Sequence, residues 1–545
     1  MTDKRLTGFV GPYCTVALIR TEMAKGGGMD LLEEVWLVGQ GPLGERGELS
    51  PLQIADPAWA DLATPRPDFR GALYQFLIGL LQTAYAPQDL QEWRDRYANP
   101  PSRDELEAAF GPYRHAFLLE NDGPAFMQDL ALPDEANQLP VLELLIDAGS
   151  SSNLYFNKPA ADHGLCEHCF AQAVLTLQLN APAGGRGVRT SLRGGGPLTT
   201  LLRPADEQAS LWQKLWLNVI PQDALGYPPI TSLSDVLPWL APTRTSDDKG
   251  GADTPPESVH PLQAYWGMPR RIRLDQSTVG QGDCAICAAK DVRLIHHYRT
   301  RHGGTNYTGN WMHPLTPYHL DAKGEKPPIS CKGHQAGRGY RDWLGLVLGN
   351  EDHQPDAALA VSRFNARPGM PRVRLWCFGF SMSNMKALCW YDSMLPVHSI
   401  GTDVLRDFTK SVKRLLDSAE SMASALHKQV KAAWFRRPGD TGSEPAVLQS
   451  FWQATEPTFY HLLNELAALD FDGDRKVVPM YRRWLRDTRQ QVLALFDHWV
   501  LSGPLEDQDM QRIVKARADL AKELNAGKAM KPLWEIVNRY DREPA

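Results

Sequence analysis

The segment "NAPAGGRGVRTSLRGGGPLTTLL", Asn180–Leu202, combines a high density of glycine with three arginines, Arg186, Arg189 and Arg193. It lacks the Gly-Lys-Ser/Thr ending of a P-loop, and its glycine spacing does not match a dinucleotide-binding fingerprint. Two interpretations remain open. The glycines could serve turns with positive φ. Alternatively, the bare backbone and the arginines could lie against a polyanion, because missing Cβ atoms allow close approach.

The size and composition of the chain predict a folded protein with two or more domains. The length of 545 residues exceeds what one hydrophobic core usually organises, and 43% of the residues are hydrophobic, enough to fill several cores. The net charge of −6 is not typical of a protein that binds nucleic acid through its overall charge, so any contact with nucleic acid needs a local basic patch. The apolar stretch Gly71–Ala86 is shorter than the roughly 20 residues of a spanning helix. With no secretory pattern in residues 1–28, we expect a cytoplasmic protein without membrane contact.

Four of the eight cysteines form two close pairs, "CEHC" at Cys166 and Cys169 and "CAIC" at Cys284 and Cys287. In a reducing compartment two such pairs more often share a metal than form disulfides, and four thiolates satisfy tetrahedral zinc. The long separation between the pairs means that one zinc would join distant segments. We therefore expect a structural zinc site.

An alternative zinc site uses only the second cysteine pair together with His296 and His302, in the manner of a Cys2His2 finger. The gap between the second cysteine and the first histidine is shorter than the roughly 12 residues of such fingers, so this site is less favoured. A catalytic zinc is less favoured still, because four thiolates leave no position for water.

The pattern of apolar residues predicts an α+β protein with a change of character near residue 399. Residues 29–398 alternate short apolar runs with glycine and proline, as expected for a mixed α/β domain. We expect residues 1–28 to form an N-terminal extension that need not be ordered. Within this domain, residues 371–397 predict a strand, a hairpin tip near Ser381–Met385 and a return strand.

Residues 399–545 show helical periodicity instead, and breakers divide them into four segments. These segments are residues 405–430, Val447–Leu466, Val478–Trp499 and Met510–Leu524. Four helices with short connections predict an up-down four-helix bundle.

Several blocks of the sequence together resemble one family. They are "SSSNLYFNKPAADHGLCEHC", "APAGGRGVRTSLRGGGPLTT", "MDLLEEVWLV", "GPAFMQDL" and "NWMHPLTPY". Taken in their order along the chain, the blocks resemble the large subunit of the type I-E CRISPR surveillance complex Cascade, the CasA family. The resemblance extends from Met29 to the carboxyl end.

The resemblance implies a subunit that performs no chemistry itself. Such a subunit recognises the protospacer-adjacent motif in double-stranded DNA through the minor groove. It also promotes duplex opening and R-loop formation with the CRISPR guide RNA, and recruits the nuclease-helicase. Its partners would be the other Cascade subunits, the guide RNA and the target DNA.

The resemblance also implies site residues in five groups. The loop that approaches the minor groove is Gly184, Gly185, Arg186 and Gly187, with arginine where glycine is common. A lysine finger aligns with Lys323, and the wedge that parts the first base pairs aligns with Ser383, Asn384 and Met385. Docking to the guide RNA and neighbouring subunits falls on Tyr155, Phe156 and Asn157, and the zinc ligands match Cys166, Cys169, Cys284 and Cys287.

Two other classes of function compete with this interpretation. A zinc-dependent nuclease or hydrolase could use His296, His297, His302 and His313, but no paired-carboxylate metal site or nucleophile motif accompanies them. An architectural, zinc-stapled adaptor would bind only proteins, and it would have no reason to expose both a glycine loop and a wedge.

Overall fold

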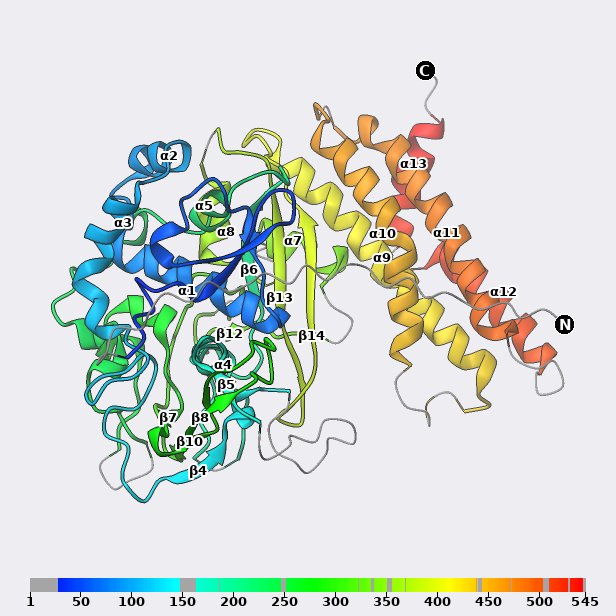
Figure 1. Ribbon diagram of the computed structural model, residues 1–545. Helices are drawn as coiled ribbons and strands as arrows, with labels where there is room; N and C mark the ends of the chain where they lie inside the picture. The colour runs from blue at the N-terminus through cyan, green and yellow to red at the C-terminus, as the bar shows by residue number, and fades with distance from the viewer. Residues whose placement is uncertain are drawn as a thin grey trace, which may run out of the picture.

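The computed structural model shows an α+β fold, as the sequence predicts. Two regions are distinct in Figure 1: a mixed region of helices and small sheets up to residue 396, and a helical region that follows it. The expected domain boundary at residue 398 stays a prediction. The structure describes residues 28–147, 163–185, 187–246, 251–321, 323–334, 338–349, 355–367, 369–437, 439, 444–471, 473–502, 509–527 and 530–542.

Helix α1 (Pro67–Ala84) lies at the centre of the mixed region (Figure 1). Proline at its first position and Asp68 in its first turn both suit a helix N-terminus. Nearly every side chain of α1 is buried, so the apolar stretch noted in the sequence is a core helix. In the part of the chain that the structure describes, no helix combines the length and the apolarity that crossing a membrane requires.

Aromatic rings fill the core around α1. The ring of Phe76 makes edge-to-face contacts with Phe117, Phe126 and Trp266 at centroid distances of 6.0, 5.6 and 6.0 Å, and Trp239 packs edge-on against Phe126 at 5.3 Å. Edge-to-face pairs contribute about 0.5–1.5 kcal/mol each beyond the area they bury. This cluster gives the mixed region a rigid centre.

Small antiparallel sheets surround this core. They contain β2-β1-β3, β4-β10-β7, β5-β9-β8, β11-β12 and β14-β13-β6 in spatial order. The strands are β1 (Leu37–Gln40), β2 (Arg46–Leu49), β3 (Asp61–Leu62), β4 (Asn137–Pro140), β5 (Leu165–Cys166), β6 (Thr199–Pro204), β7 (Arg271–Leu274), β8 (Val279–Gly282), β9 (Val292–Ile295), β10 (His297–Arg301), β11 (Tyr318–His319), β12 (Ile329–Ser330), β13 (Val373–Ser383) and β14 (Lys386–Pro396). The remaining helices of this region are α2 (Leu90–Ala98), α3 (Arg103–Phe110), α4 (Glu167–Asn180), α5 (Leu211–Trp216), α6 (Gln222–Leu225), α7 (Trp343–Val347) and α8 (Leu359–Asn365).

The predicted hairpin is present as β13 and β14, joined by a two-residue tip. Both tip residues, Asn384 and Met385, have positive φ angles, of 47° and 67°. A two-residue hairpin loop with positive φ at both positions is the type I′ turn, whose twist matches that of the strands. Asparagine tolerates this conformation, whereas methionine rarely adopts it.

The four predicted helices of the carboxyl-terminal region are present and a fifth follows them. Helix α9 buries Phe408, Val412, Leu415, Met422 and Leu426 along one face, as its periodicity predicts. Leu405, at the start of the same pattern, is instead exposed. The helices are α9 (Leu405–Trp434), α10 (Pro445–Ala467), α11 (Val478–Leu501), α12 (Met510–Ala526) and α13 (Lys531–Arg542).

One side chain of the mixed region enters the core of the helical region. The ring of Tyr340 stacks on Phe459 at 4.5 Å and meets Trp484 edge-on at 6.4 Å. Its hydroxyl lies 2.6 Å from the hydroxyl of Thr455. Because this tyrosine is buried, it fixes α10 and α11 against the chain that precedes β13.

Candidate metal centre and nucleic-acid interface

The two cysteine pairs meet where β5, β8 and β9 form one sheet. Pairing of β5 with β9 brings Cys166 beside Leu294, and pairing of β8 with β9 closes the loop that carries Cys284 and Cys287. Cys169 lies in the first turn of α4, one turn beyond Cys166. All four sulfur atoms lie within 4.8 Å of one another. The sheet register therefore assembles the cluster from segments far apart in the sequence.

The geometry of this cluster fits a tetrahedral metal site. The sulfurs of Cys166 and Cys287 are 3.7 Å apart, far beyond a disulfide bond of about 2.05 Å. With Zn–S bonds of about 2.3 Å, a tetrahedron has S–S edges of about 3.8 Å. The backbone N–H of Cys166 also donates to the sulfur of Cys284 at 3.4 Å, which supports thiolate character. Four sulfur ligands would leave no open position on a metal, so a metal ion held here would have a structural role.

The histidines expected for alternative sites do not join the cluster. In the described residues, neither His296 nor His302 belongs to a group of three or more metal-binding side chains. His313 is buried, and desolvation holds the pKa of its ring well below the usual value. Its Nδ1 accepts the backbone N–H of Leu315 at 3.1 Å, so it is a structural histidine.

The glycine loop begins after α4, with Gly184 and Gly185 exposed. Gly185 and Gly187 have φ angles of 92° and 77°, which L side chains rarely adopt. The Arg270 guanidinium donates to the carbonyl of Pro182 at 2.6 Å, and the N–H of Gly303 donates to the carbonyl of Gly187 at 2.8 Å. The loop is therefore fixed at Pro182 and Gly187, with Gly184 and Gly185 exposed between these points.

The block that follows, Ser191–Thr200, is largely buried and has a structural role. Arg193 is 4% exposed, and its guanidinium donates to Thr199, Thr316 and the side-chain oxygen of Gln75 at 2.8–3.0 Å. These acceptors are neutral, and burial lowers the pKa of Arg193 to about 10. This arginine stabilises the core of the block and is not a surface ligand.

The three successive glycines of this block allow close packing. A Cβ on Gly194 would lie 2.6 Å from the ammonium of Lys332, and one on Gly196 would lie 2.5 Å from Met382 of β13. The Lys332 ammonium itself donates to the carbonyl of Arg193 at 2.5 Å. The block thus joins β12 to the β13–β14 hairpin.

The wedge and finger residues lie at exposed ends of these same elements. Ser383, Asn384 and Met385 are exposed at the hairpin tip, with Met385 56% exposed. Lys323 is exposed on a turn closed by the N–H of Gly324 and the carbonyl of Asp321 at 2.9 Å. That turn connects β11 to β12, so the glycine loop, the finger and the wedge all extend from elements that meet at Ser191–Thr200.

Comparison with known proteins identifies the family. The model of the family described as CRISPR-associated protein Cse1 matches residues 30–495, most of the chain. The chain belongs to the Cse1 family. This assignment agrees with the resemblance found in the sequence.

Solved structures share the fold. Thermus thermophilus CasA (Cse1) has a TM-score of 0.66 at 18% identity, covering 94% of this chain and 100% of that one. Thermobifida fusca Cse1 has a TM-score of 0.65 at 18% identity, covering 93% and 99%. A chain from a structure described as a CRISPR RNA-guided surveillance complex has a TM-score of 0.64 at 16% identity, covering 92% and 100%.

Some of the predicted site residues lie outside the described part of this Cse1-family chain. These are Arg186 of the glycine loop and the docking residues Tyr155, Phe156 and Asn157. Their expected roles stay predictions.

Sequence reasoning did not find the residues that hold the glycine loop. Arg270 and Lys332 each donate to a backbone carbonyl of the segment Pro182–Arg193, and both come from distant parts of the chain. Arg270 directly precedes the alternating arginines "RIR" at 271–273, which could have drawn attention to it, whereas no pattern around Lys332 marks that residue.

Proposed function

We propose that this Cse1-family chain is the non-catalytic large subunit of a type I-E CRISPR Cascade complex. In this role it recognises the protospacer-adjacent motif in double-stranded DNA and promotes duplex opening with the guide RNA, and it recruits the nuclease-helicase. The likeness to a chain of a CRISPR RNA-guided surveillance complex supports the assignment to such an assembly.

One observation carries the DNA-reading part of the proposal: three exposed loops extend from elements joined at one buried block. The exposed Gly184 and Gly185 offer backbone without side chains, which suits close approach to a groove floor. Minor-groove reading separates mainly A·T from G·C pairs, so a sensor of this type accepts several related motifs. The acidic net charge fits a subunit whose partners hold most of the nucleic acid.

Duplex opening is assigned to the hairpin tip. The heteroduplex of guide RNA and target DNA is about as stable as the DNA duplex it replaces. A small free-energy contribution from the protein can therefore decide whether the duplex opens. Met385 offers an apolar surface against an unstacked base, and Asn384 offers a short amide. Tyr155, Phe156 and Asn157 are proposed to dock the guide RNA and neighbouring subunits.

The four-cysteine cluster is proposed to hold one structural zinc ion. It would fasten α4 to the loop between β8 and β9. We also propose that residues 29–398 and 399–545 form separate domains, since the helices α9–α13 pack mainly on one another.

Substitution of Lys323 tests the DNA-reading function. In the complex assembled with guide RNA, Lys323→Ala should weaken binding to a motif-containing duplex by about tenfold, the effect of losing one charge-assisted contact. The measurement is a titration with labelled duplexes that carry or lack the motif. Lys326→Ala, a change of a neighbouring exposed lysine, is the control. Unchanged binding would remove Lys323 from the interface, and equal binding of both duplexes by the wild type would refute motif recognition.

A further inference from the structure

Four arginines face one another across two strands of the β4-β10-β7 sheet. The antiparallel register pairs Arg271 with Arg301 and Arg273 with Arg299. Directly opposed residues, and residues two apart on one strand, project from the same face. We call these four arginines the arginine ladder. Like charges directly opposite each other destabilise a sheet, so the arrangement needs compensation from outside the strands.

Three of the four arginines have that compensation. Arg271 forms a salt bridge of 2.6 Å with the fully buried carboxylate of Asp129. Arg273 donates to the backbone carbonyls of Asn121 and Gly123 at 2.5 and 2.9 Å. Arg299 donates to the carbonyl groups of the loop that follows Asp129, at residues 133 and 134.

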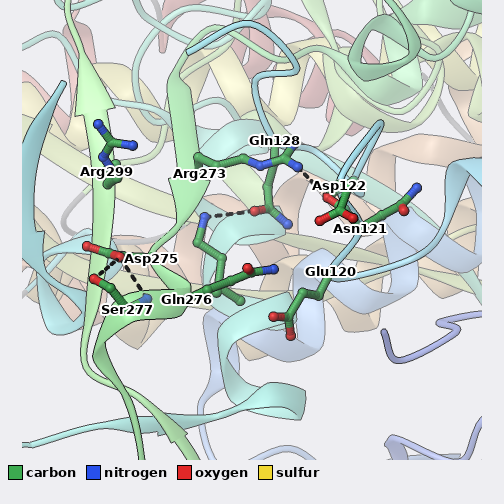
Figure 2. A pocket seen from close by; sticks show the side chains of 11 residues that line it. Glu120, Asn121, Asp122, Gln128, Arg273, Asp275, Gln276, Ser277 and Arg299 are labelled. Atoms are coloured by element: carbon green, nitrogen blue, oxygen red, sulfur yellow. Dashed lines mark hydrogen bonds between the residues drawn. The ribbon is translucent and has the colours of Figure 1, made fainter. Parts of the chain in front are cut away.

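The pair formed by Arg273 and Arg299 also has acidic neighbours. Figure 2 shows Arg273 and Arg299 on adjacent strands in a pocket that also contains Asp122 and Asp275. Burial raises the pKa of Asp275, but the hydrogen bonds from Ser277 and Gln138 and then the positive charge of Arg299 bring it below its usual value. Nearby carboxylates therefore offset the positive charge of this arginine pair.

The end of the ladder at Arg301 is not balanced in this way. Arg301 and the adjacent His302 are exposed, and within the described residues neither side chain has a hydrogen-bond or ion-pair partner. They line a cavity of about 340 Å³ together with Arg271, Asn137 and Thr245, among others. The lining offers guanidinium, amide, hydroxyl and imidazole donors. Its only carboxylate near the surface is that of Glu135.

Both strands of the ladder lead directly to the glycine loop. Arg270, immediately before β7, donates to the carbonyl of Pro182, and Gly303, immediately after His302, donates to the carbonyl of Gly187. Ser246, which binds the guanidinium of Arg189 at 2.7 Å, donates to the carbonyl of Gly304. The cavity and the glycine loop therefore share one hydrogen-bonded frame.

We propose that Arg301, with His302 and Arg271 beside it, binds a backbone phosphate of the nucleic acid next to the position read by the glycine loop. The inference rests on the proposed function, and it adds the site that fixes the loop's register on the duplex. A phosphodiester suits the cavity because a tetrahedral anion accepts from several donors at once, and arginine binds it in a bidentate way. Such contacts position a protein without reading sequence.

The test compares wild type, Arg301→Ala and Arg103→Ala in the full complex with its partner subunits and guide RNA. Arg103 is also an exposed arginine and lies on α3, outside the sheet. Duplexes with and without the motif are titrated at several salt concentrations, and guide-RNA content is measured for each complex. A fourth variant, Glu135→Gln, removes the negative charge from the cavity.

Arg301→Ala should weaken binding of both duplexes by about tenfold, leave the preference for the motif unchanged, and lower the salt-dependence slope by about one. Glu135→Gln should act in the opposite direction, and Arg103→Ala should have no effect. If Arg301→Ala instead lowers guide-RNA content while DNA affinity per loaded complex is unchanged, the bound phosphate belongs to the guide.

Unchanged DNA affinity, salt slope and guide-RNA content in Arg301→Ala would overturn the phosphate site. Loss of motif preference in the wild type would contradict the proposed function instead. Because Arg301 is exposed, a failure to fold is not expected, and the melting temperature of each variant is measured to verify this.

Discussion

Alanine substitutions at Gly196 and Gly185 should separate the structural glycines of the glycine-rich segment from those proposed to approach DNA. Gly196 has a φ of 59°, and a Cβ there would lie 2.5 Å from Met382 and 2.8 Å from the carbonyl oxygen of Phe380. Gly185 has a φ of 92°, and nothing lies within 4 Å of its Cβ position. Both changes strain the backbone, but only the first also overfills a packed site.

The magnitudes follow from these two contributions. A left-handed conformation costs an alanine about 1–2 kcal/mol, and overpacking of a core site costs about 1–3 kcal/mol. Gly185→Ala should therefore destabilise the protein by about 1–2 kcal/mol and Gly196→Ala by about 2–5 kcal/mol. The carbonyl of Phe380 is part of the backbone of β13, which pairs with β14 at this point. It cannot move aside as the end of a flexible side chain can, so the upper part of this range applies.

The assay measures thermal unfolding and duplex binding for both variants. Gly196→Ala should lower the melting temperature more than Gly185→Ala does. Relative to the stability that each variant loses, Gly185→Ala should cause the larger loss of DNA affinity. Equal destabilisation by the two changes would refute the assignment of the Gly194–Gly196 run to packing. Loss of DNA affinity only in Gly196→Ala would refute the assignment of Gly184–Gly187 to the DNA interface.

Two further predictions concern the metal and the hairpin. Purified protein should contain about one zinc ion per chain. Chelation or Cys284→Ser should lower the stability of the protein, because metal binding and folding are coupled. A metal-free preparation with an unchanged melting temperature would exclude the zinc site. Replacing Asn384 and Met385 together by glycine should leave the hairpin intact, since glycine adopts positive φ readily, and should slow strand opening more than initial duplex binding. Stopped-flow fluorescence of a duplex labelled near the motif separates the two steps, and equal effects on both would contradict the wedge role.

The sequence predicted those features that local patterns encode. Cysteine pairs at metal-binding spacing predicted the cluster of Cys166 and its three partners, and the pattern of residues 371–397 predicted the β13–β14 hairpin. The 3.6-residue period of α9 predicted its buried face because such a stripe must pack against neighbours. The prediction that its first residue, Leu405, is buried was wrong, because the end of a helix is less enclosed than its middle.

The features that were missed depend on contacts between distant segments. Glycine density looks the same in an exposed loop and in a close-packed block, so the burial of Gly194–Gly196 could not be predicted. Arg193 reads as a surface cation, yet acceptors from three other segments bury it. The arginine ladder depends on the register of β7 and β10, and a shift of one residue would place the side chains on opposite faces.

Helix α4 connects the cysteine cluster to the glycine-rich block. Cys166 caps its N-terminus and Arg193 donates to the carbonyl of Leu179 in its last turn. Thiolates at the positive end of a helix and a guanidinium at the negative end both suit the helix dipole. The helix has 14 residues, so it spans about 21 Å as a stiff rod. If the cluster holds the proposed zinc ion, its removal would release one end of this helix and, through it, weaken the support of the glycine loop. Chelation should therefore weaken duplex binding at temperatures where the chain is still folded.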